Sequence, residues 1–282
     1  MQVIDEPSAI QRCCESLRRE GKTIGLVPTM GAFHEGHVSL MRSACKNNDI
    51  VVVSIFVNPI QFGRGEDFDS YPRDLPGDLA QAERAGVDLA FTPSAEAIYP
   101  KGFQTYVDVT ELTEGLCGAS RPGHFHGVTT LVAKLFNLIR PHRAYFGQKD
   151  YQQSVVVRRL VADLHFGLDV VVLPTAREAD GLAMSSRNVR LTTPQRRAAA
   201  VLYASLSRAE ERVKIGERSA KTIVDAVRAM IEGEPLARID YVTLCHPDTL
   251  QPLDRVDGPV LLALAVRFGE TRLIDNCIIT PA

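Results

Sequence analysis

The sequence predicts an α/β protein with a doubly wound, Rossmann-like parallel sheet, followed by a smaller C-terminal α+β domain. Short apolar runs alternate with helix-like segments between Lys22 and Arg177, and several of these runs are apolar at every position. Strands of that kind are buried on both faces, as in a parallel sheet covered by helices on either side. Two helical segments and then three strand-like runs, all beyond residue 193, predict the smaller domain.

The expected elements follow in the order that such a fold requires. The predicted strands of the first domain are 23–28, 50–58, 87–93, 143–147 and 168–175, and the predicted helices between and after them are 37–48, 78–86, 127–139 and 151–165. Pro194 stands in a helix-opening position. In the second domain we expect helices at 194–213 and 219–233 and strands at 238–246, 259–268 and 272–279. We therefore predict a Rossmann-like domain at 1–175 that binds nucleotide and substrate, and an α+β domain at 176–282 that contributes a lid loop.

Composition excludes several classes of protein. The chain is 45% hydrophobic and 23% charged with a net charge of -2, which gives no general reason to expect nucleic acid or an anionic membrane as partner. No apolar run approaches the roughly 20 residues of a membrane span, and residues 1–20 lack the apolar core of a signal peptide. The six cysteines show no metal-binding spacing, so we expect reduced thiols of a cytoplasmic protein.

Two histidines three residues apart lie between the first strand and the next helix. His34 and His37 do not have the spacing of a zinc-peptidase motif, which places its histidines four apart. The remaining alternatives are a structural role, with one histidine capping the helix and the other exposed, and a phosphate cradle. A helix that begins near Gly36 would offer its free N–H groups to an anion, and the two imidazoles would add donors. Met30 and Gly31 precede them at the end of a parallel strand.

Polar side chains also follow two other strands. Asn58 and Gln61 come after the second strand, where amides suit a hydroxyl or carboxylate ligand, although an Asn-Pro turn is the simpler reading of Asn58. Lys149 and Asp150 follow Gly147 and Gln148 at the start of a helix. The lysine would be a point charge beside phosphates, and the aspartate could hold a ribose hydroxyl or cap the helix.

Two further segments carry groups that bind phosphate. Met184, Ser185, Ser186 and Arg187 lie in a polar loop after Gly181, and two hydroxyls beside a guanidinium suit a mobile phosphate clamp. Residues 121–128 carry an arginine and two histidines before a helix. Ordinary solvated loops are the alternative in both cases.

Together these segments resemble the pantothenate synthetase (pantoate–β-alanine ligase) family. The resemblance rests on five stretches in the family's order, "PTMGAFHEGH", "FVNPIQF", "RPGHFHGV", "FGQKDYQQ" and "READGLAMSSRN", and it covers roughly two-thirds of the chain. "HEGH" and "MSSR" are also similar to elements of the wider nucleotidylyltransferase superfamily. Two positions depart from the family's pattern: Gln148 replaces a common glutamate, and Ala176 replaces a common valine.

The resemblance implies ATP-dependent condensation of (R)-pantoate with β-alanine, giving pantothenate, AMP and pyrophosphate through a pantoyl adenylate. It also implies Mg²⁺, with ligands unknown, a cytoplasmic enzyme and a homodimer. The catalytic residues would be His37, usually assigned as the acid, with His34 and Lys149. Gln61 would contact pantoate and β-alanine, with Gln153 and Asn58 on pantoate. The ATP-binding residues would be Met30, Gly31, His34, Gly36, His37, Gly147, Gln148, Lys149, Asp150, Ala176, Met184, Ser185, Ser186 and Arg187.

Two rival functions share part of this pattern. A nucleotidyltransferase of the cytidylyltransferase type would keep the nucleotide on its product, but it would not need the segments around Gln61 and Gln153. A non-catalytic nucleotide-sensing module has no use for two glutamines beside a phosphate site. No convincing triad of a nucleophile with histidine and aspartate is present, which agrees with catalysis by positioning and charge stabilisation.

Overall fold

The computed structural model of the 282-residue chain describes residues 1–281, which form two compact units. Unit 1 consists of Met1–Glu111, Arg121–Gly147 and Gln153–Pro174. Unit 2 consists of Leu112–Ser120, Gln148–Gln152 and residues 175–281. The units part close to residue 176, but two short segments that precede this point in the chain belong to unit 2. The assignment of separate roles to a 1–175 and a 176–282 domain stays a prediction.

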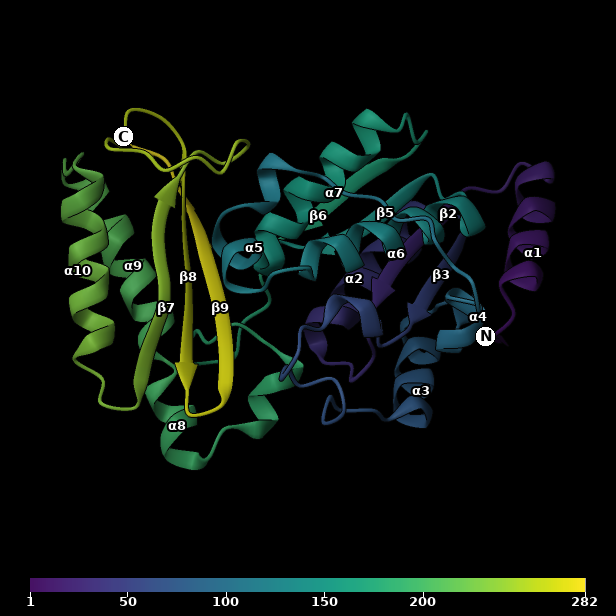
Figure 1. The fold of residues 1–282 in the computed structure, drawn as a ribbon, viewed down its shortest axis with the longest axis horizontal. Coiled ribbons are helices and arrows are strands. Elements are labelled where there is room, and N and C mark those ends of the chain that lie inside the picture. The colour runs from purple at the N-terminus through teal and green to yellow at the C-terminus, as the bar shows by residue number, and fades with distance from the viewer. Residues whose placement is uncertain (282) are drawn as a thin grey trace. The chain divides into compact units, whose positions relative to one another are not determined.

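Unit 1 contains a parallel sheet with the strand order β1-β4-β3-β2-β5-β6 (Figure 1). The strands are β1 (Gln2–Ile4), β2 (Ile24–Thr29), β3 (Ile50–Ile55), β4 (Leu89–Phe91), β5 (Arg143–Gly147) and β6 (Asp169–Leu173). The helices are α1 (Pro7–Arg19), α2 (Glu35–Asn47), α3 (Leu75–Ala85), α4 (Ala95–Ile98), α6 (His124–Ile139) and α7 (Tyr151–Asp163), of which α7 begins in unit 2. The predicted doubly wound sheet is confirmed. The chain order reverses between β2 and β5, and such a switch point is where open α/β sheets bind ligands.

Burial on both faces of the sheet explains its continuous apolar strands. Val27, Val51 and Val53 pack with α2 and α3 in one buried cluster that includes Met41 and Ala82. The alternate residues, such as Leu26 and Val52, point to the opposite face and are equally buried. β1 was missed from the sequence because three residues carry too little pattern, and it forms because Gln2–Ile4 pairs in parallel with β4.

Unit 2 contains an antiparallel sheet with the order β7-β8-β9, which confirms the predicted smaller α+β domain (Figure 1). Its elements are α5 (Leu116–Ser120), α8 (Thr193–Ala198), α9 (Val201–Lys214), α10 (Ala220–Glu232), β7 (Ala237–Cys245), β8 (Val260–Phe268) and β9 (Thr271–Ile279). The single helix expected at 194–213 is in fact two. Leu202 N bonds to Ala199 O, and this i−3 bond tightens the chain between α8 and α9.

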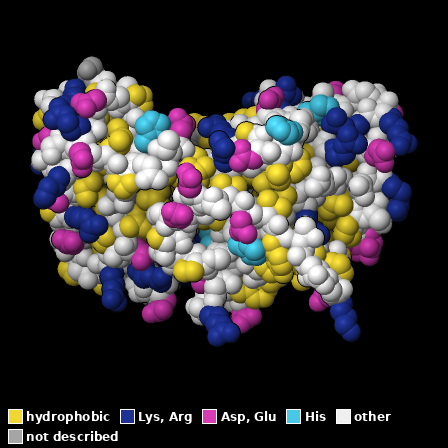
Figure 2. Space-filling model, turned by 45° about the horizontal axis from the view of Figure 1, so that its top comes forward, with side chains coloured by type: hydrophobic (Ala, Val, Ile, Leu, Met, Phe, Trp, Pro, Cys, Tyr) yellow, Lys and Arg dark blue, Asp and Glu magenta, His cyan; other side chains and the backbone are white. Residues whose placement is uncertain are grey.

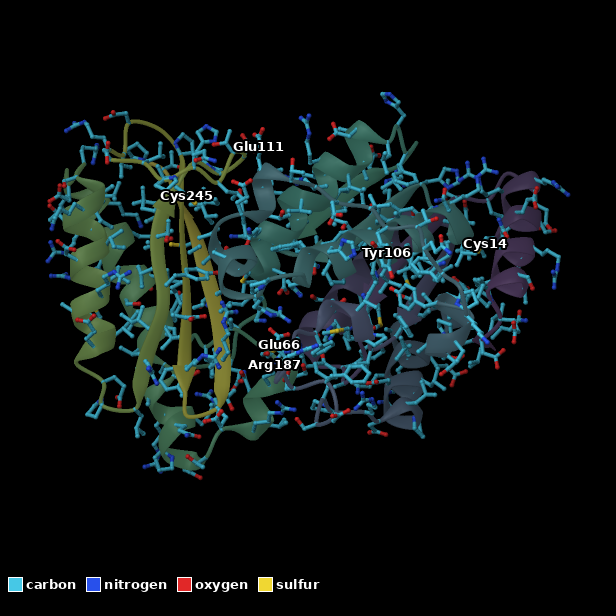
Figure 3. The ribbon with its side chains drawn as sticks, in the orientation of Figure 1. Cys14, Glu66, Tyr106, Glu111, Arg187 and Cys245 are labelled. Atoms are coloured by element: carbon cyan, nitrogen blue, oxygen red, sulfur yellow. The ribbon has the colours of Figure 1, made fainter. Side chains whose placement is uncertain are left out.

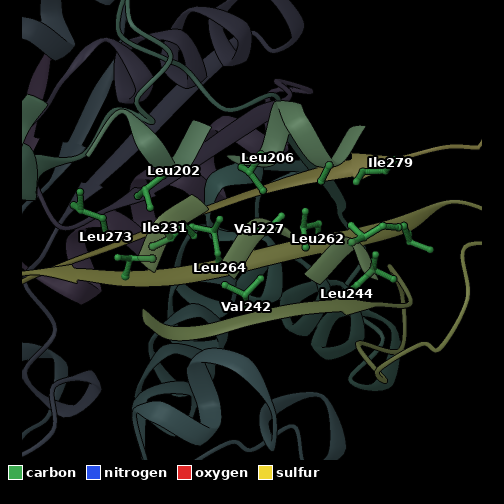
Figure 4. Close-up of a cluster of buried hydrophobic side chains, with 14 of the residues drawn as sticks. Leu202, Leu206, Val227, Ile231, Val242, Leu244, Leu262, Leu264, Leu273 and Ile279 are labelled. Carbon is green, nitrogen blue, oxygen red and sulfur yellow. The ribbon is translucent and has the colours of Figure 1, made fainter. Parts of the chain in front are cut away.

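The core of unit 2 lies between the sheet and its two long helices (Figure 4). Leu206 of α9 and Val227 of α10 pack with Leu262, Leu264 and Leu273 of the sheet, and all five are buried. Burying a leucine or valine side chain contributes about 1.5–3 kcal/mol each. This core makes β9 a firm support for the polar side chains that it carries.

Candidate active site

The turn that follows β2 is held by a buried carboxylate of α3. Asp78 Oδ2 accepts a hydrogen bond from Ala32 N (2.8 Å), and Oδ1 accepts one from Phe33 N (2.7 Å). Gly31 and Ala32 have φ of 80° and 52°, so the chain turns sharply here. A Cβ on Gly31 would lie 2.7 Å from Asp78 Oδ2, which makes glycine the residue that fits. Asp78 was missed from the sequence because its role depends on this tertiary contact.

The two histidines cap α2 reciprocally. His34 is the N-cap residue and its Nδ1 accepts from Gly36 N (3.1 Å), while His37 Nδ1 accepts from His34 N (3.3 Å). The ring centroids lie 4.1 Å apart. A nitrogen that accepts a backbone N–H carries no proton, so each neutral ring carries its proton on Nε2. The arrangement therefore serves the helix and makes both imidazoles Nε2 donors at its positive end.

Asn58 and Gln61 form one buried polar cluster with the turn of η1 (Pro59–Gln61). Asn58, which is fully buried, donates from Nδ2 to Gln61 Oε1 (3.0 Å) and Gly127 O (3.0 Å), and its Oδ1 accepts from Tyr99 OH (2.8 Å). Gln61 Nε2 in turn lies 3.1 Å from Met30 Sδ. The carboxamide of Asn58 is thus committed to fixing Gln61, and the structure joins Gln61 to the turn after β2.

A second cluster holds the main chain of Gln61. His124 Nδ1 donates to Gln61 O (2.9 Å), and Arg121 Nη1 lies 3.0 Å from His124 Nε2. Glu66, labelled in Figure 3, accepts from Arg121 Nε and Nη2 at 2.7 Å each. Burial alone would raise the pKa of the Glu66 carboxyl, but the hydrogen bonds and charge of Arg121 outweigh it and lower that pKa. The sequence indicated Arg121 and His124 but missed Glu66.

Two adjacent glutamines of α7 have different environments. Gln152 Oε1 accepts from Cys117 N (2.9 Å), and Gln152 Nε2 donates to Leu112 O and Gly115 O (2.9 Å each). Gln152 therefore binds the inserted segment 112–120 within unit 2. Gln153 lies in unit 1, is half-buried, and its carboxamide has no hydrogen-bond partner among residues 1–281. Of the two side chains, that of Gln153 is the one available to a ligand.

Lys149 lies in unit 2, in the 3-10 turn η3 (Gln148–Asp150) that precedes α7. Asn276 of β9 donates from Nδ2 to Gln148 O (3.0 Å) and to Lys149 O (2.9 Å). Among residues 1–281 the Lys149 ammonium has no ion-pair partner. Asp150 closes the 3-10 turn immediately before α7 begins at Tyr151.

The loop that carries Met184 to Arg187 is fixed at several points within unit 2. Ala176 O accepts from Met184 N (2.9 Å), and Ser185 Oγ accepts from Arg187 N (3.2 Å) to cap η4 (Ser186–Arg190). Arg196 pairs with Glu178 (2.5 Å) and Asp180 (2.6 Å). Burial alone would lower the pKa of Arg177, at the start of the loop, but the hydrogen bonds and charge of Asp275 outweigh burial and raise that pKa. Arg177, Glu178 and Asp180 lie within the signature segment 177–188, but their partners Arg196 and Asp275 lie outside it, and the sequence did not indicate these two.

The predicted ATP-binding residues are thus divided between the two units. Those of 30–37 and Gly147 lie in unit 1, and those of 148–150, 176 and 184–187 lie in unit 2. Lys and Arg side chains are interspersed with Asp and Glu on the face in view in Figure 2, as the near-neutral composition implies. Among residues 1–281 there is no cluster of three or more His, Cys, Asp or Glu side chains placed to hold a metal ion. No helix in the same range has the length and apolar character of a membrane span, and all six cysteines are free thiols.

A doubly wound sheet with imidazole and ammonium donors after its strands defines an α/β protein of the nucleotide-binding class. The family model for pantoate-beta-alanine ligase matches residues 2–278, and the chain belongs to this family. It is 54% identical to pantothenate synthetase of Moorella thermoacetica and 56% identical to that of Pelotomaculum thermopropionicum, over 99% of both chains in each case.

Solved structures agree in fold. The pantothenate synthetase of Thermus thermophilus matches with a TM-score of 0.95 at 47% identity, over 100% of both chains. The pantoate-beta-alanine ligase of Francisella tularensis, complexed with beta-gamma ATP and beta-alanine, matches with a TM-score of 0.82 at 34% identity, over 99% of this chain and 97% of that one. The chain is therefore a ligase that condenses pantoate with β-alanine using ATP, in pantothenate biosynthesis.

Proposed function

We propose that the condensation proceeds through pantoyl adenylate. The pantoate carboxylate oxygen forms a bond to the α-phosphorus of ATP while the bond to the β-phosphate oxygen breaks and pyrophosphate leaves. The neutral amine of β-alanine then attacks the acyl carbon, the acyl–oxygen bond breaks, and AMP leaves with the amine losing a proton. No step needs a covalent nucleophile of the protein, whose contribution is positioning and charge stabilisation.

The observation that carries this proposal is the state of His34 and His37. Both Nδ1 atoms accept backbone N–H groups, which makes each neutral ring a donor through Nε2 at the N-terminus of α2. Such donors suit phosphate oxygens on which negative charge develops as pyrophosphate leaves. We assign His37 as the acid, with His34 and Lys149 stabilising the same charge.

The substrates are assigned to residues by matching this chain to the signature segments of its family. Gln61, Gln153 and Asn58, all of unit 1, are assigned to the pantoate, and Gln61 also contacts β-alanine. Asn58 in addition fixes the Gln61 carboxamide. We assign ATP to the turn after β2, to the strand end and 3-10 turn that carry Lys149, and to the loop near Arg187. The full ATP set is Met30, Gly31, His34, Gly36, His37, Gly147, Gln148, Lys149, Asp150, Ala176, Met184, Ser185, Ser186 and Arg187.

Mg²⁺ fits as a companion of ATP rather than as an ion held in a cage of protein ligands. Magnesium in nucleotide enzymes keeps several waters and is bound largely by substrate phosphates, with one or two carboxylates at most. The absence of a larger ligand cluster among residues 1–281 agrees with that mode. Mg²⁺ would neutralise phosphate charge, while the chain's own donors orient the α-phosphate. We also propose a cytoplasmic homodimer, which size-exclusion chromatography with light scattering would test.

The proposed order is tested by isotope exchange. Labelled pyrophosphate should enter ATP when pantoate is present and β-alanine is absent, because adenylation needs only the first two substrates. Exchange that requires β-alanine would overturn the adenylate-first order. Product analysis with all three substrates separates the rivals: pantothenate with AMP is expected, and a nucleotidylated product or no product would exclude this function.

A further inference from the structure

Asn276 lies on β9 and contacts the main chain on both sides of the Gln148–Lys149 peptide. Its Nδ2 donates to Gln148 O (3.0 Å) and Lys149 O (2.9 Å), and its Oδ1 accepts from Gln148 Nε2 (3.5 Å). Both N–H donors and the oxygen of the carboxamide are therefore used on one turn. Asn276 is 3% exposed, so this contact is shielded from water.

The strand that carries Asn276 is rigidly placed. Asn276 pairs with Ala263 in the register of β8 and β9, and the hydrogen-bonded pairing runs along the whole strand. Asp275 points to the opposite face of the sheet, where it pairs with Arg177 at 2.7 Å. β9 thus fixes two chain segments that carry proposed ATP contacts. Asn276 holds the turn at 148–149, and Asp275 holds the start of the 177–188 loop.

We propose that Asn276 is a positioning residue for adenylation, acting through the main chain that carries Lys149. The inference rests on the proposed role of Lys149, since a lysine that binds no phosphate needs no fixed position. The lysine side chain is long and flexible, so the direction of its ammonium depends on where the backbone of residues 148 and 149 lies. A displacement of about 1 Å at a catalytic group can cost on the order of 100-fold in rate.

Asn276 supports a short turn from a position far away in the chain. η3 is a single 3-10 turn, and its carbonyl groups lie before the first full turn of α7. Two of these carbonyls, those of Gln148 and Lys149, accept hydrogen bonds from Asn276 Nδ2, which ties the turn to β9. Gln148 matches this partner, since its amide N–H donates to Asn276 Oδ1, whereas a glutamate at the same position would bring a second acceptor.

The test is a double-mutant cycle with Lys149, read out in the pantoate-dependent exchange of pyrophosphate into ATP. Asn276→Ala should lower kcat/KM for ATP roughly 10-fold or more and leave KM for pantoate unchanged. In a Lys149→Ala background, Asn276→Ala should cause no further loss, because the group that it positions is gone. Asn276→Ser retains one hydrogen-bond donor, so its kcat/KM for ATP should fall less than that of Asn276→Ala.

A matched control is Asn48→Ala in unit 1. Asn48 also donates from Nδ2 to a main-chain carbonyl, that of Ala44, but it lies at the other end of α2. Its removal should leave KM for ATP unchanged. Thermal unfolding of each variant confirms that it folds, and if Asn276→Ala does not fold, the cycle is completed with Asn276→Ser.

The outcomes separate this inference from the proposed function. Losses that add in the double mutant, or equal rises of KM for ATP and pantoate, would show a merely structural role for Asn276. Wild-type kinetics in Asn276→Ala would overturn the inference directly. Near-normal exchange in Lys149→Ala would instead overturn the assignment of Lys149, and with it the premise of the cycle.

Discussion

Arg177 and Asp275 form a bidentate ion pair with a fully buried carboxylate. Arg177 Nη1 lies 2.7 Å from Asp275 Oδ2 and Nη2 lies 3.0 Å from Oδ1, with side-chain exposures of 21% and 0%. The guanidinium also donates to Gly181 O (2.9 Å) and lies 4.5 Å from the centroid of the Tyr203 ring. The pair therefore fastens the start of the 177–188 loop to β9.

Asp275→Asn should destabilise the protein strongly. The substitution leaves a half-buried guanidinium without its counter-charge, and breaking a buried pair on one side costs about 3–5 kcal/mol. Calorimetric or denaturant unfolding would measure the loss. Asp163→Asn is the matched control, since its pair with Arg159 is exposed and should be worth about 0.5 kcal/mol or less. Equal losses in the two variants would contradict a structural role for the Arg177–Asp275 pair.

Lys149→Ala should abolish most activity in a folded enzyme. Removing a preorganised charge from developing phosphate oxygens typically costs about 100- to 1000-fold in rate. The ammonium makes no ion pair among residues 1–281, so its removal breaks no contact that supports the fold. The exchange rate and the unfolding temperature would be measured together, with the exposed Lys101→Ala as control. Near-normal turnover would remove Lys149 from the site.

The sequence predicted the fold well where burial leaves a continuous pattern. β2, β3 and β5 were found because they are buried on both faces, and β7 to β9 because their apolar runs are long. β1 was missed because a strand of three residues is too short to show a hydrophobic pattern. The break between α8 and α9 was missed because alanines continue a helical pattern whether or not the chain turns.

The signature segments of the site were predicted, but their supports were not. His34 and His37 are recognisable from their place before a helix, whereas Asp78, Asp275 and Asn276 act through contacts that only the tertiary register creates. An aspartate within a helix and an Asp-Asn pair within a strand look like ordinary polar residues. The supports could therefore have been found only by knowing which carbonyl and N–H groups lie opposite them.

Glu66→Gln should weaken the cluster around Arg121 in a pH-dependent way. The pKa of the Glu66 carboxyl lies below its ordinary value of 4.5, because the Arg121 hydrogen bonds outweigh burial. Its stabilisation is therefore fully present above pH 4.5 and is lost as the pH falls through the lowered pKa. At neutral pH the loss of a charge-assisted hydrogen bond should cost about 1.5–3 kcal/mol.

The measurement is the difference in unfolding free energy between wild type and Glu66→Gln from pH 7 down to pH 3. The difference should shrink below pH 4.5, and KM for pantoate should rise because Arg121 and His124 hold Gln61. Glu15→Gln, which breaks an exposed pair with Arg19, serves as control. A difference that is constant with pH would argue against ionised Glu66 as the partner of Arg121.

The last prediction separates the two roles of the histidines. An asparagine at an N-cap position supplies an oxygen that accepts the N–H at residue 36, and a glutamine at the third helical position can accept from the N-cap N–H. His34→Asn and His37→Gln should therefore preserve the reciprocal cap of α2 while removing the imidazole donors. His34→Ala removes the cap as well and should lose about 0.5–2 kcal/mol of stability.

Pyrophosphate exchange should fall by about 100-fold or more in both cap-preserving variants, since each loses a donor to developing charge. Their unfolding temperatures should stay close to that of wild type, which excludes a collapse of α2 as the cause. Adenylate formation and its reversal should slow by the same factor, because both pass through the transition state that the imidazoles stabilise. Wild-type exchange in both variants would mean that the imidazoles only cap the helix, and ATP would then have to be bound without them.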